Sequence, residues 1–367
     1  MNQQRLEKLQ QQMKTAVIDG IALVPGPNMV YFSHIHSHLS ERPIVLFLPA
    51  NAAPALIIPG LEAMKGRAAG VPDERIFAWS DEQGYVGAFQ QASETLGLSN
   101  WQLGVEALHM RVLERDLLAQ VAPGVCFSHA DHLIANLRMI KDEAEIAAME
   151  KAVAVAEKAM ERLLPQIKIG QTEKQIAAML TQELVNGGAE TMAFGPIIAA
   201  GPNGASPHAV PTDRPIQAGD LLTIDWGVYV DGYPSDITRT FAVGEIDAEL
   251  RRIYNAVALA NEQGKQAAGP HASGQDVDRA AREVIEEAGY GQYFIHRTGH
   301  GLGLEIHEPP DMVETNTRQL QPGNVFTVEP GIYLPGRGGV RIEDNMVVTA
   351  DGARSLTSFP RELITVG

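Results

Sequence analysis

The chain has 367 residues, a length that leaves room for two domains. Its formal net charge is −16 and it contains no basic run, which argues against nucleic acid or an anionic membrane as a partner. Its one cysteine, Cys126, excludes an intrachain disulfide and suits the cytoplasm. The polar N-terminus lacks the apolar core of a signal peptide and no apolar run is long enough to span a bilayer, so we expect a cytoplasmic protein.

Residues 1–136 alternate between strand-like and helix-like segments after an opening amphipathic helix. Short apolar runs at 21–24, 43–48, 55–58 and 103–105 predict strands, and helical patterns occur at 61–69, 85–96 and 111–121. This alternation predicts an α/β domain with a partly parallel sheet. Gly26, which lies between two prolines, indicates a turn.

Three histidines alternate in this first half, at His34, His36 and His38. On a strand they would share one face and could bind a metal ion. No cysteine or carboxylate pair lies near them to complete such a site, so we interpret the segment as a polar loop.

We place the domain boundary at residue 137, just before a long amphipathic helix that starts near Lys141. Thr172 and Gln175 form a capping box for a second helix. The later elements are expected at 196–199 (strand), 248–267 (helix) and 275–288 (helix). Because two helices followed by strands occur twice, the pattern indicates an internal duplication.

The stretch DWGVYVDGYPSD, residues 225–236, predicts a β-hairpin between apolar strands. Asp231-Gly232 fits a tight two-residue turn, in which case Asp225 pairs with Thr238. Alternation then puts Asp236 on the same face as Asp225, one diagonal step or roughly 7–8 Å away. A bulge would break this parity, and two exposed aspartates on a solvated sheet are the alternative.

Further polar residues follow in three apolar or glycine-rich segments. HRTGHGLGLEIHE supplies His296, His300 and His307, and its glycines let backbone approach a site closely. VFTVEPGIY places Glu329 at the end of an apolar strand, which Pro330 ends or bends.

Glu343 lies within the apolar run of GVRIEDNMVV, with Arg341 on the same strand face. A buried carboxylate needs a partner. Together with Asp225, Asp236 and Glu329, Glu343 makes a set of four carboxylates, to which the histidines add imidazole groups.

This ligand set suits divalent metal ions. Carboxylate oxygens favour Mn²⁺, and imidazole extends the range to Co²⁺, Fe²⁺ or Zn²⁺. Four carboxylates would over-neutralise one ion, whereas two ions about 3.5–4 Å apart balance the charge and lower the pKa of a bridging water. The implied reaction is hydrolysis.

These motifs resemble those of the pita-bread metallopeptidases, in particular Xaa-Pro dipeptidases (prolidases) and aminopeptidase P. The resemblance is carried by IDWG, SDITRTF, HGLGLEIHE, VEPGIY and RIEDN, in that order along the chain. It implies an α/β creatinase-like N-terminal domain over 1–136 and an α+β pita-bread catalytic domain over 137–367.

The resemblance also implies a role for each site residue. Asp225 would bind one metal ion, Asp236 and Glu343 would bridge two, and His300 and Glu329 would bind the other. Glu329 would also carry the proton of the attacking water. His208 (in SPHAVPTDRP), His296 and His307 would contact the substrate and the tetrahedral intermediate, and Arg341 would orient ligands or bind substrate. For His296, a buried structural role is the alternative.

We therefore expect a homodimer with two Mn²⁺ ions (Co²⁺, Zn²⁺ or Fe²⁺ being alternatives) that hydrolyses the bond before proline in Xaa-Pro dipeptides. Aminopeptidase P, which acts on longer peptides, is the nearest alternative. Methionine aminopeptidase is disfavoured by the N-terminal domain, and creatinase, which works without metals, by the carboxylates. A catalytically silent binding protein on this fold is the remaining alternative, although no ligand is missing.

Overall fold

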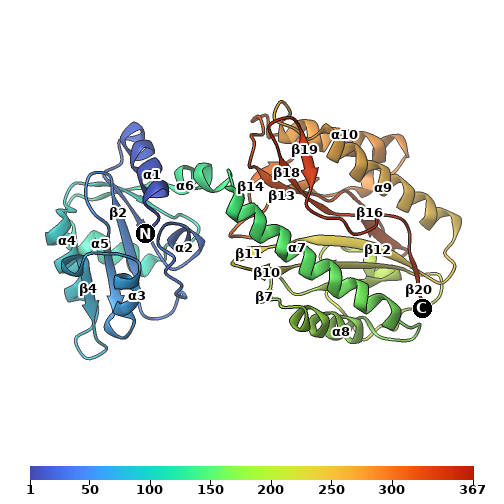
Figure 1. Ribbon diagram of the computed structural model, residues 1–367, viewed down its shortest axis with the longest axis horizontal. Coiled ribbons are helices and arrows are strands. Elements are labelled where there is room, and N and C mark those ends of the chain that lie inside the picture. Colours follow the sequence, from blue (N-terminus) through green and yellow to red (C-terminus); the bar gives the residue numbers. More distant parts are fainter. The chain divides into compact units, whose positions relative to one another are not determined.

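A computed structural model describes all of residues 1–367. The chain divides into two compact units, Met1–Arg138 and Met139–Gly367. Figure 1 colours the first unit from blue to teal and the second from green to red. None of the helices combines the length and the apolar composition that a membrane crossing requires.

The first unit is built on one six-stranded sheet with the strand order β4-β3-β2-β1-β5-β6. Strand β1 is parallel to β5, β5 to β6 and β3 to β4, whereas β2 is antiparallel to both of its neighbours. The strands are β1 (Gly20–Leu23), β2 (Val45–Pro49), β3 (Ala55–Pro59), β4 (Ile76–Trp79), β5 (Gln102–Val105) and β6 (Cys126–His129). The helices are α1 (Gln3–Ala16), α2 (Pro27–Ser33), α3 (Ala63–Ala68), α4 (Val86–Leu96), α5 (Val112–Val121) and α6 (Asp131–Arg138). The predicted α/β class with a partly parallel sheet is confirmed.

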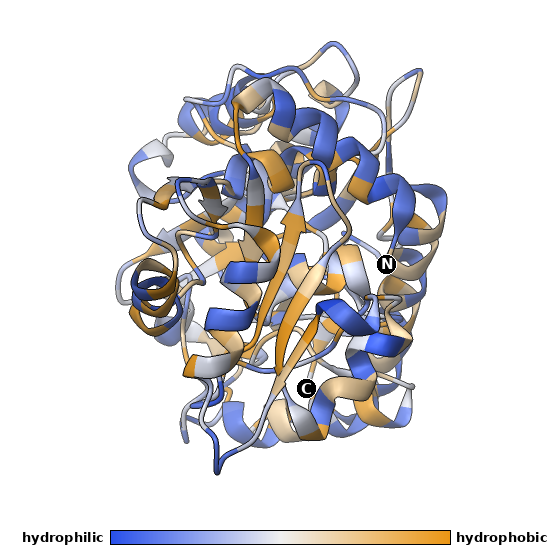
Figure 2. Cartoon of the chain, turned by 90° about the vertical axis from the view of Figure 1, so that its left-hand side faces the viewer, coloured by the Kyte–Doolittle hydropathy of each residue, from blue (hydrophilic) through white to orange (hydrophobic).

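The central strands β1, β2 and β3 are buried along their whole length, which explains their continuous apolar sequences. Figure 2 shows such strands in orange between helices with hydrophilic outer residues. Strands β4 and β6 are not among the strands predicted from the sequence, because they lie at the two sheet edges and bury fewer side chains. The turn expected at Gly26 is confirmed, since Pro25 and Gly26 form a turn directly before α2, in which Pro27 takes the first helical position.

The three alternating histidines lie at the end of α2 and in the loop after it. His34 caps α2 with a φ of 57°, and His36 and His38 have no regular secondary structure. All three side chains are exposed. The structure thus agrees with the polar-loop interpretation.

The second unit begins with two capped helices. Asp142 and Glu145 form a capping box at the start of α7 (Glu143–Leu163), and Thr172 and Gln175 form the predicted one at α8 (Glu173–Asn186). The second helix pair is α9 (Ala248–Ala267) and α10 (Gly274–Glu287). Two helices followed by strands therefore occur twice, as expected.

The strands of the second unit form four sheets. These are β20-β12-β9-β8, β14-β13-β15-β18-β19, β11-β10-β7 and β16-β17. Their bounds are β7 (Thr191–Met192), β8 (Ile197–Ala200), β9 (Leu221–Trp226), β10 (Val228–Val230), β11 (Tyr233–Pro234), β12 (Ile237–Val243), β13 (Gly299–Gly301), β14 (Glu308–Met312), β15 (Val325–Val328), β16 (Gly331–Leu334), β17 (Gly338–Arg341), β18 (Asp344–Val348), β19 (Ala353–Ser355) and β20 (Thr365–Val366).

Each helix pair covers strands with its apolar face. Met149 of α7 and Leu180 of α8 share a buried cluster with Phe241 of β12. On the other side, Val277 of α10 packs with Phe326 of β15. The polar residues of the second unit that face away from these helices are consequently free to meet between the sheets.

The central hairpin has the predicted register. Asp225 pairs with Thr238 across β9 and β12, and the turn residues Asp231 and Gly232 have φ values of 51° and 74°. The same register continues to the turn without a bulge, because Val230 pairs with Tyr233. Asp225 and Asp236 therefore lie on the same face of the hairpin.

Candidate functional site

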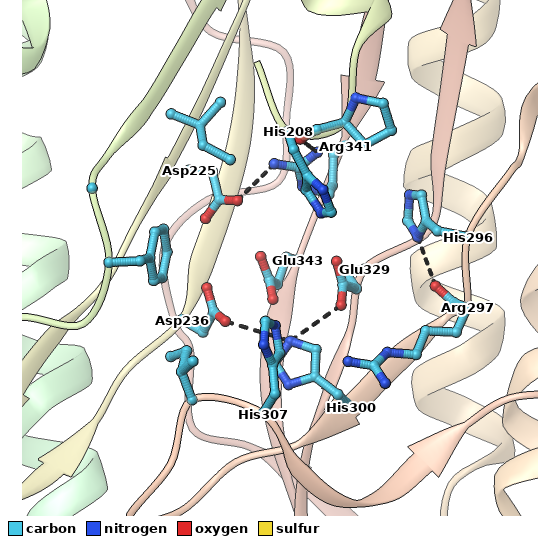
Figure 3. A pocket seen from close by; sticks show the side chains of 15 residues that line it. His208, Asp225, Asp236, His296, Arg297, His300, His307, Glu329, Arg341 and Glu343 are labelled. Atoms are coloured by element: carbon cyan, nitrogen blue, oxygen red, sulfur yellow. Dashed lines mark hydrogen bonds and ion pairs between the residues drawn. The ribbon is translucent and has the colours of Figure 1, made fainter. Parts of the chain in front are cut away.

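A cavity of about 440 Å³ lies in the second unit and is lined by all nine residues that the sequence indicates as site residues. Figure 3 shows four carboxylates turned toward a common space, with His208 and Arg341 on one side of it and His300 and His307 on the other. The other lining residues are Phe194, Gly195, Ile197, Pro207, Arg297 and Ile306.

The hairpin supplies two buried carboxylates, Asp225 and Asp236. Oδ2 of Asp225 accepts a hydrogen bond from Nη2 of Arg341 at 2.6 Å, whereas its Oδ1 is buried without any hydrogen-bond partner. The backbone N–H of Asp236 donates to Oδ1 of Asn345 at 3.1 Å, which fixes that residue just before β12.

Glu343 reaches the same space from the connection between β17 and β18. Its N–H donates to the carbonyl oxygen of Thr238 at 3.0 Å, and its Oε2 accepts from Oγ1 of Thr238 at 2.6 Å. Its Oε1, like Oδ1 of Asp225, is buried without a partner. A buried polar atom of this kind is costly unless a cation or a proton satisfies it.

His300 is held between two strands by its glycine neighbours. A Cβ atom on Gly299 would lie 1.8 Å from the carbonyl oxygen of Thr327, and one on Gly301 would lie 2.3 Å from that of Glu308. Only glycine therefore permits β14 and β15 to approach β13 this closely. The predicted close backbone approach is confirmed at these two positions.

The imidazole of His300 points a lone pair at two carboxyl groups. Its Nδ1 lies 3.1 Å from the carbonyl oxygen of Gly301, which can only accept, so Nδ1 carries the ring proton. Its Nε2 lies 3.5 Å from Oδ2 of Asp236 and 3.3 Å from Oε1 of Glu329. Burial, together with the neighbouring His307, lowers the pKa of His300 to about 3, so the ring is neutral.

The pKa values of the carboxyl groups are raised in this crowded, buried site. Burial raises the pKa of Glu329 to about 7, even though Arg341 opposes the shift. Burial and the charge of Glu343 raise the pKa of Asp236, and burial and the charge of Glu329 raise that of Glu343. The raised pKa values favour the protonated forms of these groups, which a bound cation would have to replace.

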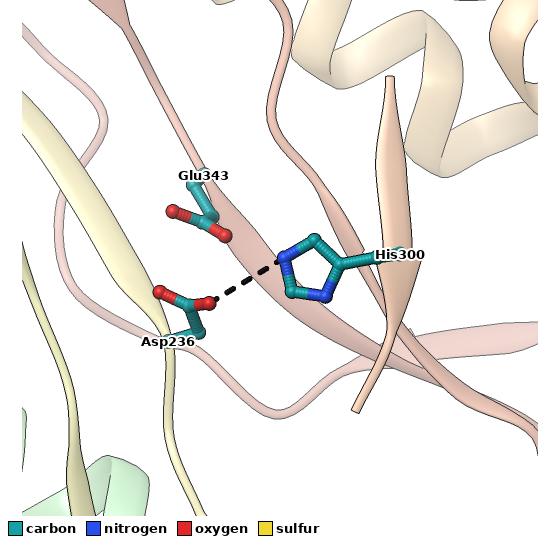
Figure 4. Close-up of side chains that lie close together, drawn as sticks. All are labelled: Asp236, His300 and Glu343. Carbon is teal, nitrogen blue, oxygen red and sulfur yellow. Dashed lines mark ion pairs between the residues drawn. The ribbon is translucent and has the colours of Figure 1, made fainter. Parts of the chain in front are cut away.

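The residues present fit a divalent metal ion. Ligand atoms of Asp236, His300 and Glu343 all lie within 4.8 Å of one another. Figure 4 shows these three side chains turned toward one another. The two unpartnered carboxylate oxygens and the lone pair of the neutral histidine face the same space. A set of one imidazole and several carboxylates is typical of Mn²⁺, Co²⁺, Fe²⁺ or Zn²⁺.

Arg341 is part of a buried chain of hydrogen bonds that the sequence reveals only in part. Its Nη1 donates to the hydroxyl oxygen of Tyr333 at 2.9 Å, and that hydroxyl lies 2.9 Å from Nε2 of His296. Burial raises the pKa of Tyr333 to about 12 and lowers that of His296 to about 4, so both are neutral. Tyr333 is absent from the predicted site residues, although its place two residues after Gly331 in VEPGIY puts it on one face with Arg341 of the paired strand β17.

The open side of the cavity carries groups that can meet a ligand. His208 and His307 are exposed, and the ring of His307 stands edge-on to that of His300 at 4.2 Å. Arg297 also lines the cavity and forms an ion pair with Asp311 at 2.7 Å.

Two family profiles match the chain. That of metallopeptidase family M24 matches residues 147–350, and that of the creatinase/prolidase N-terminal domain matches residues 5–140. The chain is 39% identical over 358 residues to the probable dipeptidase PepE of Mycobacterium bovis, a match that covers 96% of this chain and 93% of that protein.

Solved structures share the fold over nearly the whole chain. A prolidase from Thermococcus sibiricus superimposes with a TM-score of 0.92 at 34% identity and covers 100% of both chains. An X-Pro aminopeptidase from Thermotoga maritima has a TM-score of 0.84 at 30% identity and covers 97% of this chain and 100% of its own. The predicted fold class, a creatinase-like N-terminal domain followed by a pita-bread catalytic domain, is confirmed.

Proposed function

The chain belongs to metallopeptidase family M24, and from this premise we propose that it hydrolyses the peptide bond before proline, with Xaa-Pro dipeptides as its substrates. The observation that carries the proposal is the meeting of four carboxylates and a neutral histidine in one cavity of about 440 Å³. The relatives named dipeptidase and prolidase support the substrate class. A homodimer and a cytoplasmic location stay predictions.

We propose that two divalent metal ions, Mn²⁺ in the first place, bind to this cluster. Asp225 would hold one ion through its unpartnered Oδ1, and Asp236 and Glu343 would bridge both ions. His300 and Glu329 would hold the second ion. When bound by these residues, such ions would polarise the scissile carbonyl and lower the pKa of a bound water.

Glu329 is the residue best suited to move a proton. Its Oε1 is oriented by Oγ1 of Thr327 at 3.2 Å, and a carboxylate fixed beside the attacking water can act as a general base. It would take the proton of the attacking water and pass it to the proline nitrogen. That nitrogen belongs to a tertiary amide without a hydrogen, so it must receive a proton to leave.

The remaining groups would orient the substrate. His208 and His307 stand at the exposed side of the cavity, where their ring N–H groups can donate to the carbonyl oxygen that becomes negative in the tetrahedral intermediate. Arg341 offsets the charge of Asp225 and is fixed in place by Thr238, Tyr333 and the carbonyl oxygen of Pro207. His296 would hold Tyr333 in this chain rather than meet the substrate directly.

Aminopeptidase P activity on longer peptides is the second candidate, favoured by the likeness to the X-Pro aminopeptidase from Thermotoga maritima. The test uses purified protein with added Mn²⁺ and compares Met-Pro with Met-Pro-Ala. Cleavage of the dipeptide alone supports the dipeptidase, and efficient cleavage of the tripeptide supports the aminopeptidase. If metal binds and neither peptide is cleaved, the proposal is wrong.

A further inference from the structure

A buried ion pair lies next to the cavity without being part of it. Nζ of Lys141 donates to Oε1 of Glu308 at 2.7 Å, and the two side chains are 1% and 4% exposed. Taking both charges out of water is costly, so a buried pair of this kind is weak evidence for stability. An apolar pair would fill the same space without that cost.

Glu308 is tied by its backbone to both histidines that face the carboxylates. It directly follows His307 and starts β14, where it pairs with Gly301, the residue after His300. The two rings that flank this strand pair are in edge-on contact at 4.2 Å. A shift of Glu308 would therefore move His307 relative to His300.

The carboxylate of Glu308 lies in a space that the chain keeps open for it. A Cβ atom on Gly303 would lie 2.2 Å from Oε1 of Glu308, so a side chain at this position would displace the carboxylate. Gly303 belongs to the short segment between β13 and β14 that ends in His307. The segment is thus folded around the carboxylate.

The backbone of Lys141 is anchored to the residues that precede β15. Its N–H donates to the carbonyl oxygen of Gly323 at 2.9 Å, and Nδ2 of Asn324 donates to the carbonyl oxygen of Met139 at 3.0 Å. These residues directly precede β15, whose last residue, Val328, adjoins Glu329. The ammonium group therefore projects from a fixed point of the same sheet.

We propose that the Lys141–Glu308 ion pair is a positioning device that sets His307 against His300 at the open side of the cavity. Neither residue lines the cavity, so both act through His307. The effect of this ion pair on catalysis rests on the proposed function, in which His307 meets the substrate. Its effect on the position of the His307 ring does not rest on that function.

The kinetic test is a double-mutant cycle with Mn²⁺ and Met-Pro. We expect Lys141→Met and Glu308→Gln each to lower kcat/KM by roughly 10–100-fold, as losses of residues that orient functional groups do. In a His307→Ala background the same substitutions should change kcat/KM by less than about 2-fold, because their effect passes through that ring. Lys174→Met is the control, since this lysine forms an exposed pair with Asp213. Equal losses with and without His307 would overturn the proposal.

A second readout does not depend on activity. In protein labelled with ¹⁵N-histidine, with diamagnetic Zn²⁺ added, the His307 ring signal is assigned by its loss in His307→Ala. We expect Lys141→Met to shift or broaden this signal and Lys174→Met to leave it unchanged. An unchanged signal in folded Lys141→Met overturns the proposal. A shifted signal in a protein that cleaves no Xaa-Pro peptide instead overturns only the proposed function.

The variant Lys141→Met/Glu308→Leu separates positioning from stability. Replacing both charges by apolar side chains is often neutral or stabilising, so this protein should keep its midpoint of urea unfolding. We expect it nevertheless to show the displaced His307 signal. A normal His307 signal in this variant would mean that packing alone sets the ring, which contradicts the proposal.

Discussion

Nε2 of His300 lies 3.3 Å from Oε1 of Glu329, and neither atom carries a proton when the histidine is neutral and the glutamate is ionised. The contact is then one of a lone pair with a negative oxygen. A proton on Glu329 or a metal cation between the two groups removes the repulsion. Protons and divalent cations therefore compete for the same cluster.

The first prediction follows from this competition. Because the pKa values of Asp236, Glu329 and Glu343 are raised, the metal-free site holds protons that a metal ion must displace. We expect the affinity for Mn²⁺ to rise between about pH 6 and pH 8. Calorimetry in two buffers of different ionisation enthalpy measures the proton release directly. A binding heat that does not depend on the buffer would contradict this prediction.

The second prediction concerns the stability of the metal-free protein. The pKa of Glu329 is raised to about 7, so between about pH 4.5 and pH 7 the folded state binds more protons at this group than the unfolded state does. The contribution of Glu329 to the free energy of unfolding should therefore fall as the pH rises through this window, by on the order of 3 kcal/mol. The contributions of His300 and His296, whose pKa values are lowered, rise with pH up to about 6.5 and oppose it over most of the same window.

The variant Glu329→Gln isolates this contribution, because the amide cannot ionise. In urea unfolding after removal of metal with EDTA, it should gain stability over the wild type as the pH rises from about 5 to 7 and then hold that gain. The contribution of His296 cancels in the difference between the two proteins, whereas that of His300 changes with the substitution because its Nε2 contacts Glu329. A difference that stays constant over the whole range would show that Glu329 ionises normally in the folded state.

The third prediction uses two aspartates of one hairpin. Asp236→Asn removes a buried carboxylate of the metal cluster, and we expect it to lower metal occupancy and to reduce kcat/KM by more than about 100-fold. Asp231→Asn is the matched control, since Asp231 lies at the turn and its carboxylate pairs with the exposed Lys151. The control should stay within about 2-fold of the wild type. Full metal occupancy in Asp236→Asn would show that Asp236 is not a metal ligand.

The fourth prediction addresses Tyr333. Tyr333→Phe removes the hydroxyl that accepts from Arg341 and contacts His296, and leaves an Arg341 N–H of the buried chain unsatisfied. We expect a loss of about 10-fold or more in kcat with little change in metal affinity. Tyr254→Phe is the control, because that buried hydroxyl donates to the carbonyl oxygen of Arg361 away from the cavity. Equal activities of the two variants would argue against a role for Tyr333.

Local pattern was sufficient to predict the hairpin. The turn chemistry of Asp231-Gly232 predicts the register, and the register alone puts Asp225 and Asp236 on one face. The buried central strands were likewise visible as apolar runs. The edge strands β4 and β6 were not, because an exposed edge leaves little apolar pattern to detect.

Contacts between distant segments could not be predicted in the same way. The bond from Thr238 to Glu343 spans 105 residues, and the ion pair of Lys141 with Glu308 spans 167. No local period relates such partners. Their meeting depends on how two sheets pack, which the sequence of either segment does not specify.

The last prediction concerns the turn on which the hairpin depends. Gly232 has a φ of 74°, in the left-handed region, and nothing lies within 4 Å of a Cβ atom placed on it. Gly232→Val should therefore cost about 1–2 kcal/mol of unfolding free energy through backbone strain alone. Gly352→Val is the control, since Gly352 also has open space around it but no positive φ. Urea unfolding measures both. Pairing with β9 holds the register from Ile237 to Ala242. The affinity of the folded Gly232→Val variant for Mn²⁺ should therefore not change. A loss of affinity would mean that the turn influences the position of the metal ligands.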